Sequence, residues 1–361
     1  MTRSVTWLAL SLVVGPIAVG VAACVGDEPS FPSDAPDAQA AHDATTDAAD
    51  TGAPIDARGD TASDADAGGG VISPDASAEA ASDASTDALP AADASPCDPT
   101  APFRTIENVA ELNGPTDDES ARLSPDQRTA YFSQRSGPQP SAGGFNVRMA
   151  TREDPDASFD AISTLPLGID PSGPSVSGDG TLLYYASADD GGPPELRVST
   201  RPFDKSNSKQ LSNINSDAWD FTPYVRPDNL ELYFSSTRTG NEEIYVTERA
   251  NGDFMGVTSI GAANNVYNTA DSGASNERTP VITADGLMLY FASDRSGNFD
   301  IYLVRRKTLA SAFEGPVVQV TELDTSASEF PDWISPDACT LYFRSDRAGG
   351  KGGRDIWRAK R

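Results

Sequence analysis

The sequence is poor in histidine, and the histidine it has lies outside the part of the chain that can build a core. The single residue, His42, falls in a segment made of Asp, Ala, Ser and Thr, so residues 97–361 contain none. Histidine is the usual base of a nucleophilic catalytic site and a member of the commonest zinc ligand sets. We therefore expect residues 97–361 to hold no His-based nucleophilic site, no metal and no other cofactor.

Basic residues are scarce as well. The chain has 27 Lys and Arg against 54 Asp and Glu, which gives a formal net charge of −27. Within residues 97–361 the acidic residues still outnumber the basic ones, 38 to 25. A protein that binds the phosphate backbone of a nucleic acid needs a basic face. The charge balance thus predicts no nucleic-acid partner.

The longest apolar run stands at the N-terminus. Residues 1–23 contain one basic residue, Arg3, then an apolar stretch and small residues that lead to Cys24. This order is typical of a secretory signal peptide. The letters VAAC, which end at Cys24, resemble the lipobox at which bacterial lipoprotein precursors are acylated and cleaved. We predict a lipid on Cys24. An uncleaved anchor helix is the alternative, but a Gly-Pro pair interrupts the ~18–20 apolar residues that such a helix needs.

Residues 24–96 have the composition of a linker. After Cys24 they hold 16 acidic residues against one basic residue, Arg58, which is more than half of the formal negative charge of the chain. Too few large apolar groups are present to offset the entropy of ordering, so we predict a disordered acidic tether. Acidic pairs such as Asp64 and Asp66 leave calcium binding as an alternative, although the rest of a calcium loop is missing.

Residues 97–361 hold nearly all of the aromatic residues and repeat one pattern five times. In each copy an aspartate is followed five residues later by a pair of aromatic residues. Successive aspartates are 49 to 57 residues apart, and they are Asp126, Asp179, Asp228, Asp285 and Asp337. A repeat of this period without a helical pattern is typical of a propeller or an array.

Each copy reads as four strands. A short apolar run such as PVIT leads into a turn of the type Pro-Asp or Ala-Asp-Gly, which suits a tight hairpin. An aromatic strand such as LMLYFAS follows, then a third strand such as DIYLVRR, and a fourth piece precedes the next copy. We predict an all-β fold, a five-bladed β-propeller over residues 97–361, with six blades as the alternative. The aromatic pairs are expected to pack in the core and between blades.

The five copies resemble the WD40-like (PD40) repeats of TolB-type propellers, whose units read roughly P-x-x-S-P-D-G-x-x-L-Y-F-x-S-x-R-x-G-x-x-D-I-Y. The resemblance covers residues 97–361. It implies a propeller that serves as a platform for recognition. The second copy departs from the pattern, because its stretch SADDGG lacks the arginine that the other copies carry.

The ends of the repeat region predict how the ring closes. The last strand, DIWRAKR, has no fourth piece after it, and the stretch FRTIENVAEL from Phe103 is a fourth piece with no copy before it. If this stretch supplies the outer strand of the last blade, the exposed edge of that blade disappears and the ring is latched. Cys97 and Cys339 would then belong to one blade. Since disulfides persist in exported proteins, we predict a Cys97–Cys339 bond, with two free or buried thiols as the alternative.

Acidic residues recur shortly before the first turn of each copy. They are Asp118, Asp170, Asp220, Glu277 and Glu329, with Asp170 one place out of register. The innermost strand of a blade lines the central channel, so these acids could surround one channel mouth and bind a cation or a basic peptide. The interpretation that we favour is structural: each acid pairs with a repeat arginine of a nearby turn and fixes the packing between blades. The repeat arginines are Arg135, Arg238, Arg295 and Arg347.

Together these features predict an exported, lipid-anchored, monomeric propeller that binds an envelope protein or glycan as a scaffolding module. Val25 follows Cys24, whereas an aspartate there favours retention at the inner membrane in lipoproteins that resemble this one. We therefore expect the outer membrane. The alternative function is a carboxylate-based glycan hydrolase or lyase at the channel mouth, which would need two unpaired carboxylates roughly 5 to 10 Å apart.

Overall fold

The computed structural model describes residues 97–361 except 138–142, 190 and 265–274. The predicted signal peptide, the lipidation site Cys24 and the acidic tether lie outside the described residues. Within the described part of the chain, no helix has the length and apolar character that crossing a membrane requires.

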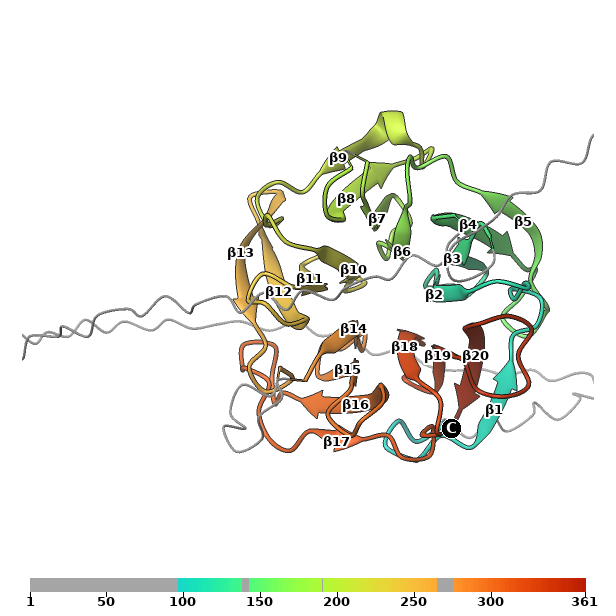
Figure 1. Cartoon of the computed structure of the whole chain (residues 1–361). Coiled ribbons are helices and arrows are strands. Elements are labelled where there is room, and N and C mark those ends of the chain that lie inside the picture. The colour runs from blue at the N-terminus through green and yellow to red at the C-terminus, as the bar shows by residue number, and fades with distance from the viewer. Residues whose placement is uncertain (1–96, 138–142, 190, 265–274) are drawn as a thin grey trace, which may run out of the picture. The chain divides into compact units, whose positions relative to one another are not determined.

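The strands of the described residues form five antiparallel sheets of four strands each, which stand around a common axis (Figure 1). Blade 1 contains β2 (Asp118–Leu123), β3 (Thr129–Arg135), β4 (Phe145–Thr151) and β5 (Asp160–Thr164). Blade 2 contains β6 (Ser172–Val176), β7 (Leu182–Ser187), β8 (Glu195–Thr200) and β9 (Ser208–Gln210), with a short 3-10 helix, η1 (Lys205–Asn207), before β9. Blade 3 contains β10 (Asp220–Val225), β11 (Glu231–Ser236), β12 (Glu243–Ala250) and β13 (Asp253–Ser259).

Blade 4 contains β14 (Glu277–Ile282), β15 (Met288–Ser293), β16 (Asp300–Arg305) and β17 (Val318–Gln319). Blade 5 contains β18 (Glu329–Ile334), β19 (Thr340–Ser345) and β20 (Asp355–Lys360), and β1 (Thr105–Asn108) completes it. The predicted all-β, five-bladed propeller is confirmed, and the alternative of six blades is not.

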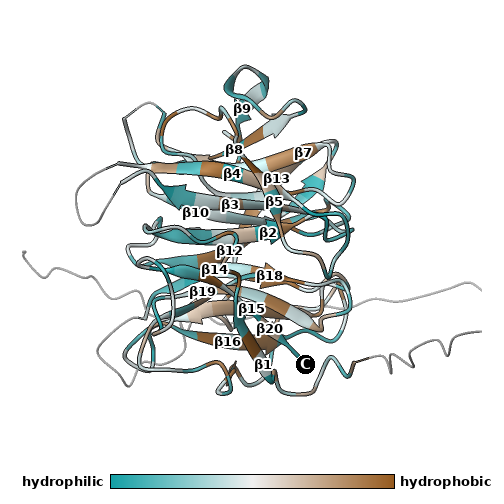
Figure 2. Ribbon diagram, turned by 90° about the vertical axis from the view of Figure 1, so that its right-hand side faces the viewer, coloured by the Kyte–Doolittle hydropathy of each residue, from teal (hydrophilic) through white to brown (hydrophobic). Residues whose placement is uncertain are grey.

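The core follows from the alternation in the second strand of each blade. The aromatic pairs are almost wholly buried, with exposed fractions of 0–1% from Tyr131 and Phe132 to Tyr342 and Phe343. Seen from the side, apolar stretches lie along the strands (Figure 2). Burying large aromatic side chains on both faces of each sheet is the main favourable term in such a fold.

Every inner strand shifts register against its neighbour at one point. In four blades a residue at the shift has a positive φ, and these are Ser120 (59°), Gly173 (61°), Thr222 (48°) and Thr279 (52°). The preceding blade in the ring supports the distorted backbone. The Gly173 N–H donates to the Ser133 hydroxyl of blade 1 at 3.0 Å, and Arg344 of blade 5 donates to the Ser120 hydroxyl at 2.7 Å. The shifts therefore join neighbouring blades close to the axis.

A second set of contacts joins the blades farther out. An arginine stands at the end of the third strand of each blade or directly after it, and in blades 2 to 5 its guanidinium donates to the preceding blade. The pairs are Arg201 with Tyr131 (3.3 Å), Arg249 with Tyr184 (2.5 Å), Arg306 with Glu231 (2.8 Å) and Arg361 with Tyr290 (2.6 Å). The sequence analysis did not single out these arginines.

The ring closes as predicted. β1 pairs with β20 in antiparallel register from Thr105 opposite Lys360 to Asn108 opposite Trp357. A disulfide joins Cys97 to Cys339 across a sequence separation of 242 residues, with the two Cα atoms 6.2 Å apart. N-terminal and C-terminal residues thus share blade 5, and the disulfide holds the N-terminal segment to it.

Candidate functional site

Four of the five acids predicted at a channel mouth begin the inner strands but are fully buried. Asp118, Asp220, Glu277 and Glu329 are the first residues of β2, β10, β14 and β18, and each has an exposed fraction of 0%. Three of them pair with the repeat arginine of their own blade. The distances are 2.6 Å for Arg238–Asp220, 3.1 Å for Arg295–Glu277 and 3.1 Å for Arg347–Glu329.

The same arginines also hold the segment that enters their blade. The Nη2 atoms of Arg238, Arg295 and Arg347 donate to the backbone carbonyls of Ile214, Ala263 and Leu323. Each guanidinium therefore neutralises a buried carboxylate and satisfies a loop carbonyl at once. Burial raises the pKa of Glu277, while the hydroxyls of Ser275 and Ser293 and the Arg295 guanidinium lower it. Three acids thus pair with repeat arginines, as in the structural interpretation, but each pair lies within one blade and not between two blades.

Blade 1 uses different partners because its repeat arginine stands one residue closer to the aromatic pair. Arg135 stands three residues after the aromatic pair, whereas the corresponding arginines of blades 3 to 5 stand four residues after it. Arg135 consequently pairs with Asp117 at 2.9 Å. Asp118 accepts hydrogen bonds from the Gly114 N–H (2.6 Å) and from Gln134 Nε2 (2.7 Å) instead. Burial raises the pKa of Asp118 to about 6, although these two hydrogen bonds act against the rise.

Blade 2 has neither the acid nor the arginine in place. Asp170 is exposed, lies before β6 with a φ of 51°, and accepts the Phe145 N–H of blade 1. Another acid, Asp189, receives the Ile169 N–H at 2.7 Å and faces Lys205 at 3.3 Å. The five acids thus do not form a continuous ring.

One group of carboxylates among the described residues is close enough to share a cation. One oxygen each of Asp300, Asp324 and Glu329 lies within 4.8 Å of the others. Protein groups already occupy this cluster. Gln319 Nε2 donates to Asp300 at 3.0 Å and to Asp324 at 3.2 Å, and Glu329 pairs with Arg347. Burial raises the pKa of Asp300 to about 6.

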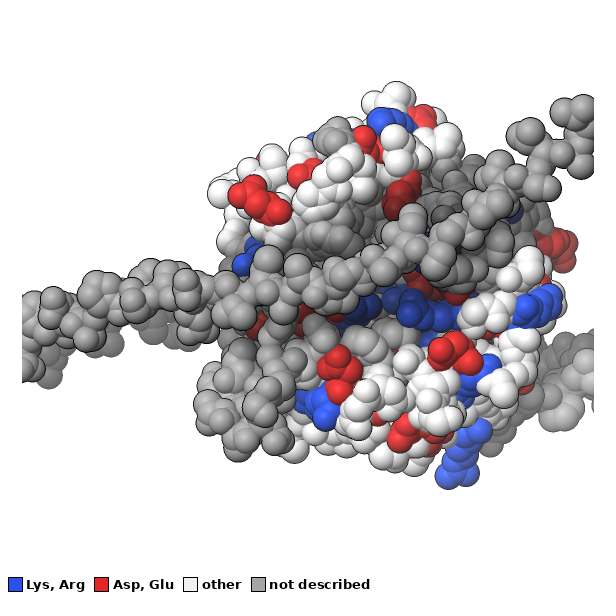
Figure 3. All heavy atoms as spheres, in the orientation of Figure 1, with Lys and Arg blue, Asp and Glu red and all other residues white. Residues whose placement is uncertain are grey.

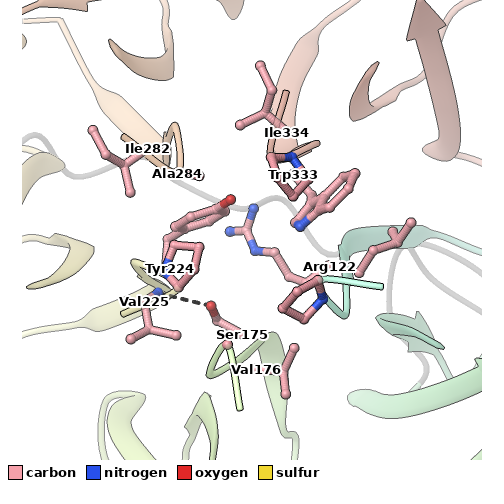
Figure 4. A pocket seen from close by; sticks show the side chains of 14 residues that line it. Arg122, Ser175, Val176, Tyr224, Val225, Ile282, Ala284, Trp333 and Ile334 are labelled. Carbon is pink, nitrogen blue, oxygen red and sulfur yellow. Dashed lines mark hydrogen bonds between the residues drawn. The ribbon is translucent and has the colours of Figure 1, made fainter. Parts of the chain in front are cut away.

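The other end of the channel forms a funnel. It lies where the inner strands run into the first turns, and it encloses a cavity of about 190 Å³ (Figure 4). All five blades contribute apolar wall residues, and these include Leu123, Val176, Val225, Ile282, Trp333 and Ile334. Exposed prolines of three turns, Pro125, Pro227 and Pro336, stand at its edge.

Arg122 is the charged residue of the funnel wall. It lies on β2 with an exposed fraction of 1%, and its guanidinium carbon is 4.6 Å from the centre of the Tyr224 ring. Among the described residues, no acceptor forms a hydrogen bond with its Nε, Nη1 or Nη2 atom. Burial lowers the pKa of Arg122 to about 10, so the guanidinium keeps its proton at neutral pH. A buried cation without a hydrogen-bond partner is rare in proteins.

The nearest acid already has a cation. Asp332 of β18 accepts a hydrogen bond from Arg344 at 2.8 Å, and Arg344 also faces Glu119 at 3.3 Å. Burial raises the pKa of Asp332 to about 6, although Arg344 and Arg122 act against the rise. Arg354 adds a third guanidinium, 3.3 Å from Glu119. Basic side chains are also visible near the middle of the ring on the face shown in Figure 3.

The repeat pattern of the sequence already sets Arg122 apart. The residues four places before the turn aspartates are Arg122, Ser175, Tyr224, Val281 and Trp333. These positions lie on the five inner strands. Four of these residues are neutral and one is charged, so Arg122 departs from the repeat pattern. Such a departure is a better sign of function than a residue that recurs with the fold.

Comparison with known proteins finds similarity to solved structures only. No family model and no curated protein matches the chain. Among solved structures, TolB from Acinetobacter baumannii is 17% identical to this chain. The match covers 68% of this chain and 55% of the TolB chain, with a TM-score of 0.41. A putative TolB from Agrobacterium tumefaciens is 16% identical over 71% of this chain and 89% of its own, with a TM-score of 0.44. A chain of a nidogen/laminin complex is 10% identical. That match covers 63% of this chain and 74% of the other chain, with a TM-score of 0.40.

The strand pairing and the repeats define the class of protein. It is a five-bladed β-propeller of repeated four-stranded units, closed by an N-terminal strand. Its axial funnel carries one buried arginine without a hydrogen-bond partner among the described residues.

Proposed function

We propose that the protein is an exported binding module, anchored in the outer membrane by a lipid on Cys24, whose propeller binds a partner protein through the axial funnel. The order of signal peptide, Cys24 and acidic tether supports export and anchoring. The Cys97–Cys339 disulfide is consistent with an oxidising compartment. The observation that carries the binding function is the apolar funnel to which every blade contributes.

The funnel has the composition of a recognition site. Tyr224, Trp333 and Arg122 line it, and aromatic residues and arginine are enriched at the centres of protein interfaces. Its position on the axis means that the five inner strands hold its walls. A partner would therefore meet a surface that is already formed and would lose little free energy in ordering it.

The geometry does not favour the glycan hydrolase or lyase. Such an enzyme needs two carboxylates that face a substrate in a cleft. Asp220, Glu277 and Glu329 are instead fully buried and paired with arginines. The funnel itself has no carboxylate in its lining.

One experiment in cells tests both the anchoring and the binding. A photo-crosslinking amino acid replaces Pro336 at the funnel edge or, as a matched control, Val318 on the outer strand β17, which is 48% exposed. Both crosslinker variants are made once with Cys24 intact and once with Cys24→Ser. The cells are fed an alkyne-labelled fatty acid, which marks lipidated protein. We expect the crosslinker at position 336 to form adducts with a partner protein and the crosslinker at position 318 to form none. We expect labelled protein in the outer-membrane fraction only when Cys24 is intact.

Label that survives Cys24→Ser contradicts the lipid anchor. Equal adducts from positions 318 and 336 contradict the funnel as the binding site. A glycan adduct at position 336 would show that the partner is a glycan and not a protein.

A further inference from the structure

We propose that the funnel binds the C-terminal end of a partner chain, with the terminal carboxylate on Arg122 and an apolar last side chain against the walls. This inference rests on the proposed protein-binding function and names the part of the partner that enters. Figure 4 shows the Arg122 guanidinium in the funnel between Tyr224 and Trp333.

The anionic group follows from the unused donors of Arg122. A guanidinium has five N–H donors in a planar fork that fits both oxygens of a carboxylate. Within the described residues none of the three nitrogen atoms of Arg122 has a partner, and the side chain is 1% exposed. A buried charge of this kind is costly unless an opposite charge meets it. A carboxylate in the funnel would supply that charge and two acceptors.

The charged groups around Arg122 do not balance its positive charge, so an anionic ligand can do so. The charged or titratable groups that act on it are Asp332, Tyr224 and Arg344. Asp332 is held by Arg344 at 2.8 Å. Burial raises the pKa of Tyr224 to about 12, so its hydroxyl is neutral at physiological pH. Arg344 and Arg354 also face Glu119, so Arg122, Arg344 and Arg354 share two acids and one positive charge is left in excess.

The walls and the size select a chain end. Pockets for whole small molecules usually span about 300–1,000 Å³, and this cavity is about 190 Å³. An internal loop would carry two passing backbone segments into an apolar space, where their N–H and C=O groups would lack partners. A chain end brings in one backbone segment, and its carboxylate meets Arg122. The apolar walls then favour residues such as Leu or Phe at the last position.

Binding of short peptides to the full-length protein tests the assignment. Acetylated Ser-Gly-Ser-Gly-X peptides, with X being Leu, Val, Phe or Trp, are titrated as free acids and as C-terminal amides by calorimetry. We expect at least one free acid to bind tenfold or more tightly than its amide. The variant Arg122→Met, which keeps the length of the side chain and removes the charge, should bring this ratio close to one.

The matched control is Arg128→Met, because Arg128 is exposed in the turn that follows β2. This variant should keep the preference for the free acid. We also expect Arg122→Met to unfold at the same temperature as the unchanged protein or at a higher one, since it removes a buried charge without a partner.

Three results would overturn the proposal. The first is a ratio near one for all four peptides with Arg122 present. The second is a clear fall in unfolding temperature for Arg122→Met, which would make Arg122 a structural counter-charge for Asp332. The third is binding of 3-phenylpropionate as tight as that of the best peptide, which would make the site one for small carboxylates.

Crosslinking separates this inference from the proposed function. If position 336 still captures the same protein when Arg122→Met is introduced, the binding function stands and the role of the chain end is wrong. If position 336 captures no protein with Arg122 present, the proposed function itself is wrong.

Discussion

At the residue scale, the buried acid–arginine pairs stabilise the ends of the inner strands. Glu277 has no exposed surface, and its Oε1 atom accepts from Ser275, Ser293 and Arg295. The Arg295 guanidinium also lies over the Phe291 and Tyr302 rings and reaches the Ala263 carbonyl. Removing one partner of such a pair leaves the other charge buried and uncompensated, which costs more than the pair itself contributes.

We predict that Arg295→Met lowers the free energy of unfolding by about 3 kcal/mol at pH 8. Urea denaturation measures the loss. Arg305→Met is the matched control, since Arg305 is exposed on the same blade, and it should change stability by less than about 0.5 kcal/mol. The double variant Arg295→Met, Glu277→Gln should be more stable than Arg295→Met alone. Equal stability of the two would show that the pair is not coupled.

At the element scale, β1 covers the edge of β20, which would otherwise be the outermost strand of blade 5. The strand has four residues and pairs only with β20. A strand this short contributes few ladder bonds, so other contacts must hold it. The disulfide does so from the N-terminal side, and Arg361 adds a hydrogen bond to the Ala101 carbonyl at 2.8 Å.

We predict that Cys339→Ser lowers the free energy of unfolding by about 2–5 kcal/mol, because the bond closes a loop that includes nearly the whole propeller. Urea denaturation without reductant measures the difference. With dithiothreitol present, the unchanged protein should approach the stability of the variant. Two reactive thiols at Cys97 and Cys339 in the denatured, unreduced protein would contradict the bond.

At the scale of the whole molecule, burial of acids makes stability depend on pH. Burial raises the pKa values of Asp118, Asp300 and Asp332 to about 6 each. Each of these groups binds a proton more readily in the folded chain than in the unfolded one. Their contribution is therefore fully present below the unfolded pKa, near 4, and is lost as the pH rises through about 6.

The aspartates of the first turns act in the opposite direction. A hydrogen bond from the Ser124 hydroxyl lowers the pKa of Asp126, and one from the Ser177 hydroxyl lowers that of Asp179. A carboxyl with a lowered pKa stabilises the fold above the unfolded pKa and loses this effect as the pH falls below it. The two groups of acids together place maximum stability between about pH 4 and 6.

We predict that the free energy of unfolding is about 2 kcal/mol or more higher at pH 5 than at pH 8. Urea denaturation across this range measures the difference. Asp118→Asn should make it smaller, because that side chain can no longer ionise. Asp160→Asn, at an exposed position on β5, should leave it unchanged. A steady rise in stability from pH 5 to pH 8 would contradict the prediction.

The sequence by itself determined the repeats, the number of blades, the closing strand and the cysteine pair. Each of these depends on local patterns, since the turn from Asp285 and the pair Tyr290 and Phe291 shape a hairpin wherever they occur. A period repeated five times then leaves little choice of architecture. The pairing of Cys97 with Cys339 followed from the placement of β1 in blade 5.

Only the tertiary structure decided where the charges lie. The spacing of the acids placed them at one mouth of the channel, but did not predict that Glu277 would be buried or that Asp170 would be exposed. The isolation of Arg122 depends on five strands, far apart in the sequence, meeting at one level of the axis. Whether a charge finds a partner is a property of such long-range contacts, and a local pattern does not contain them.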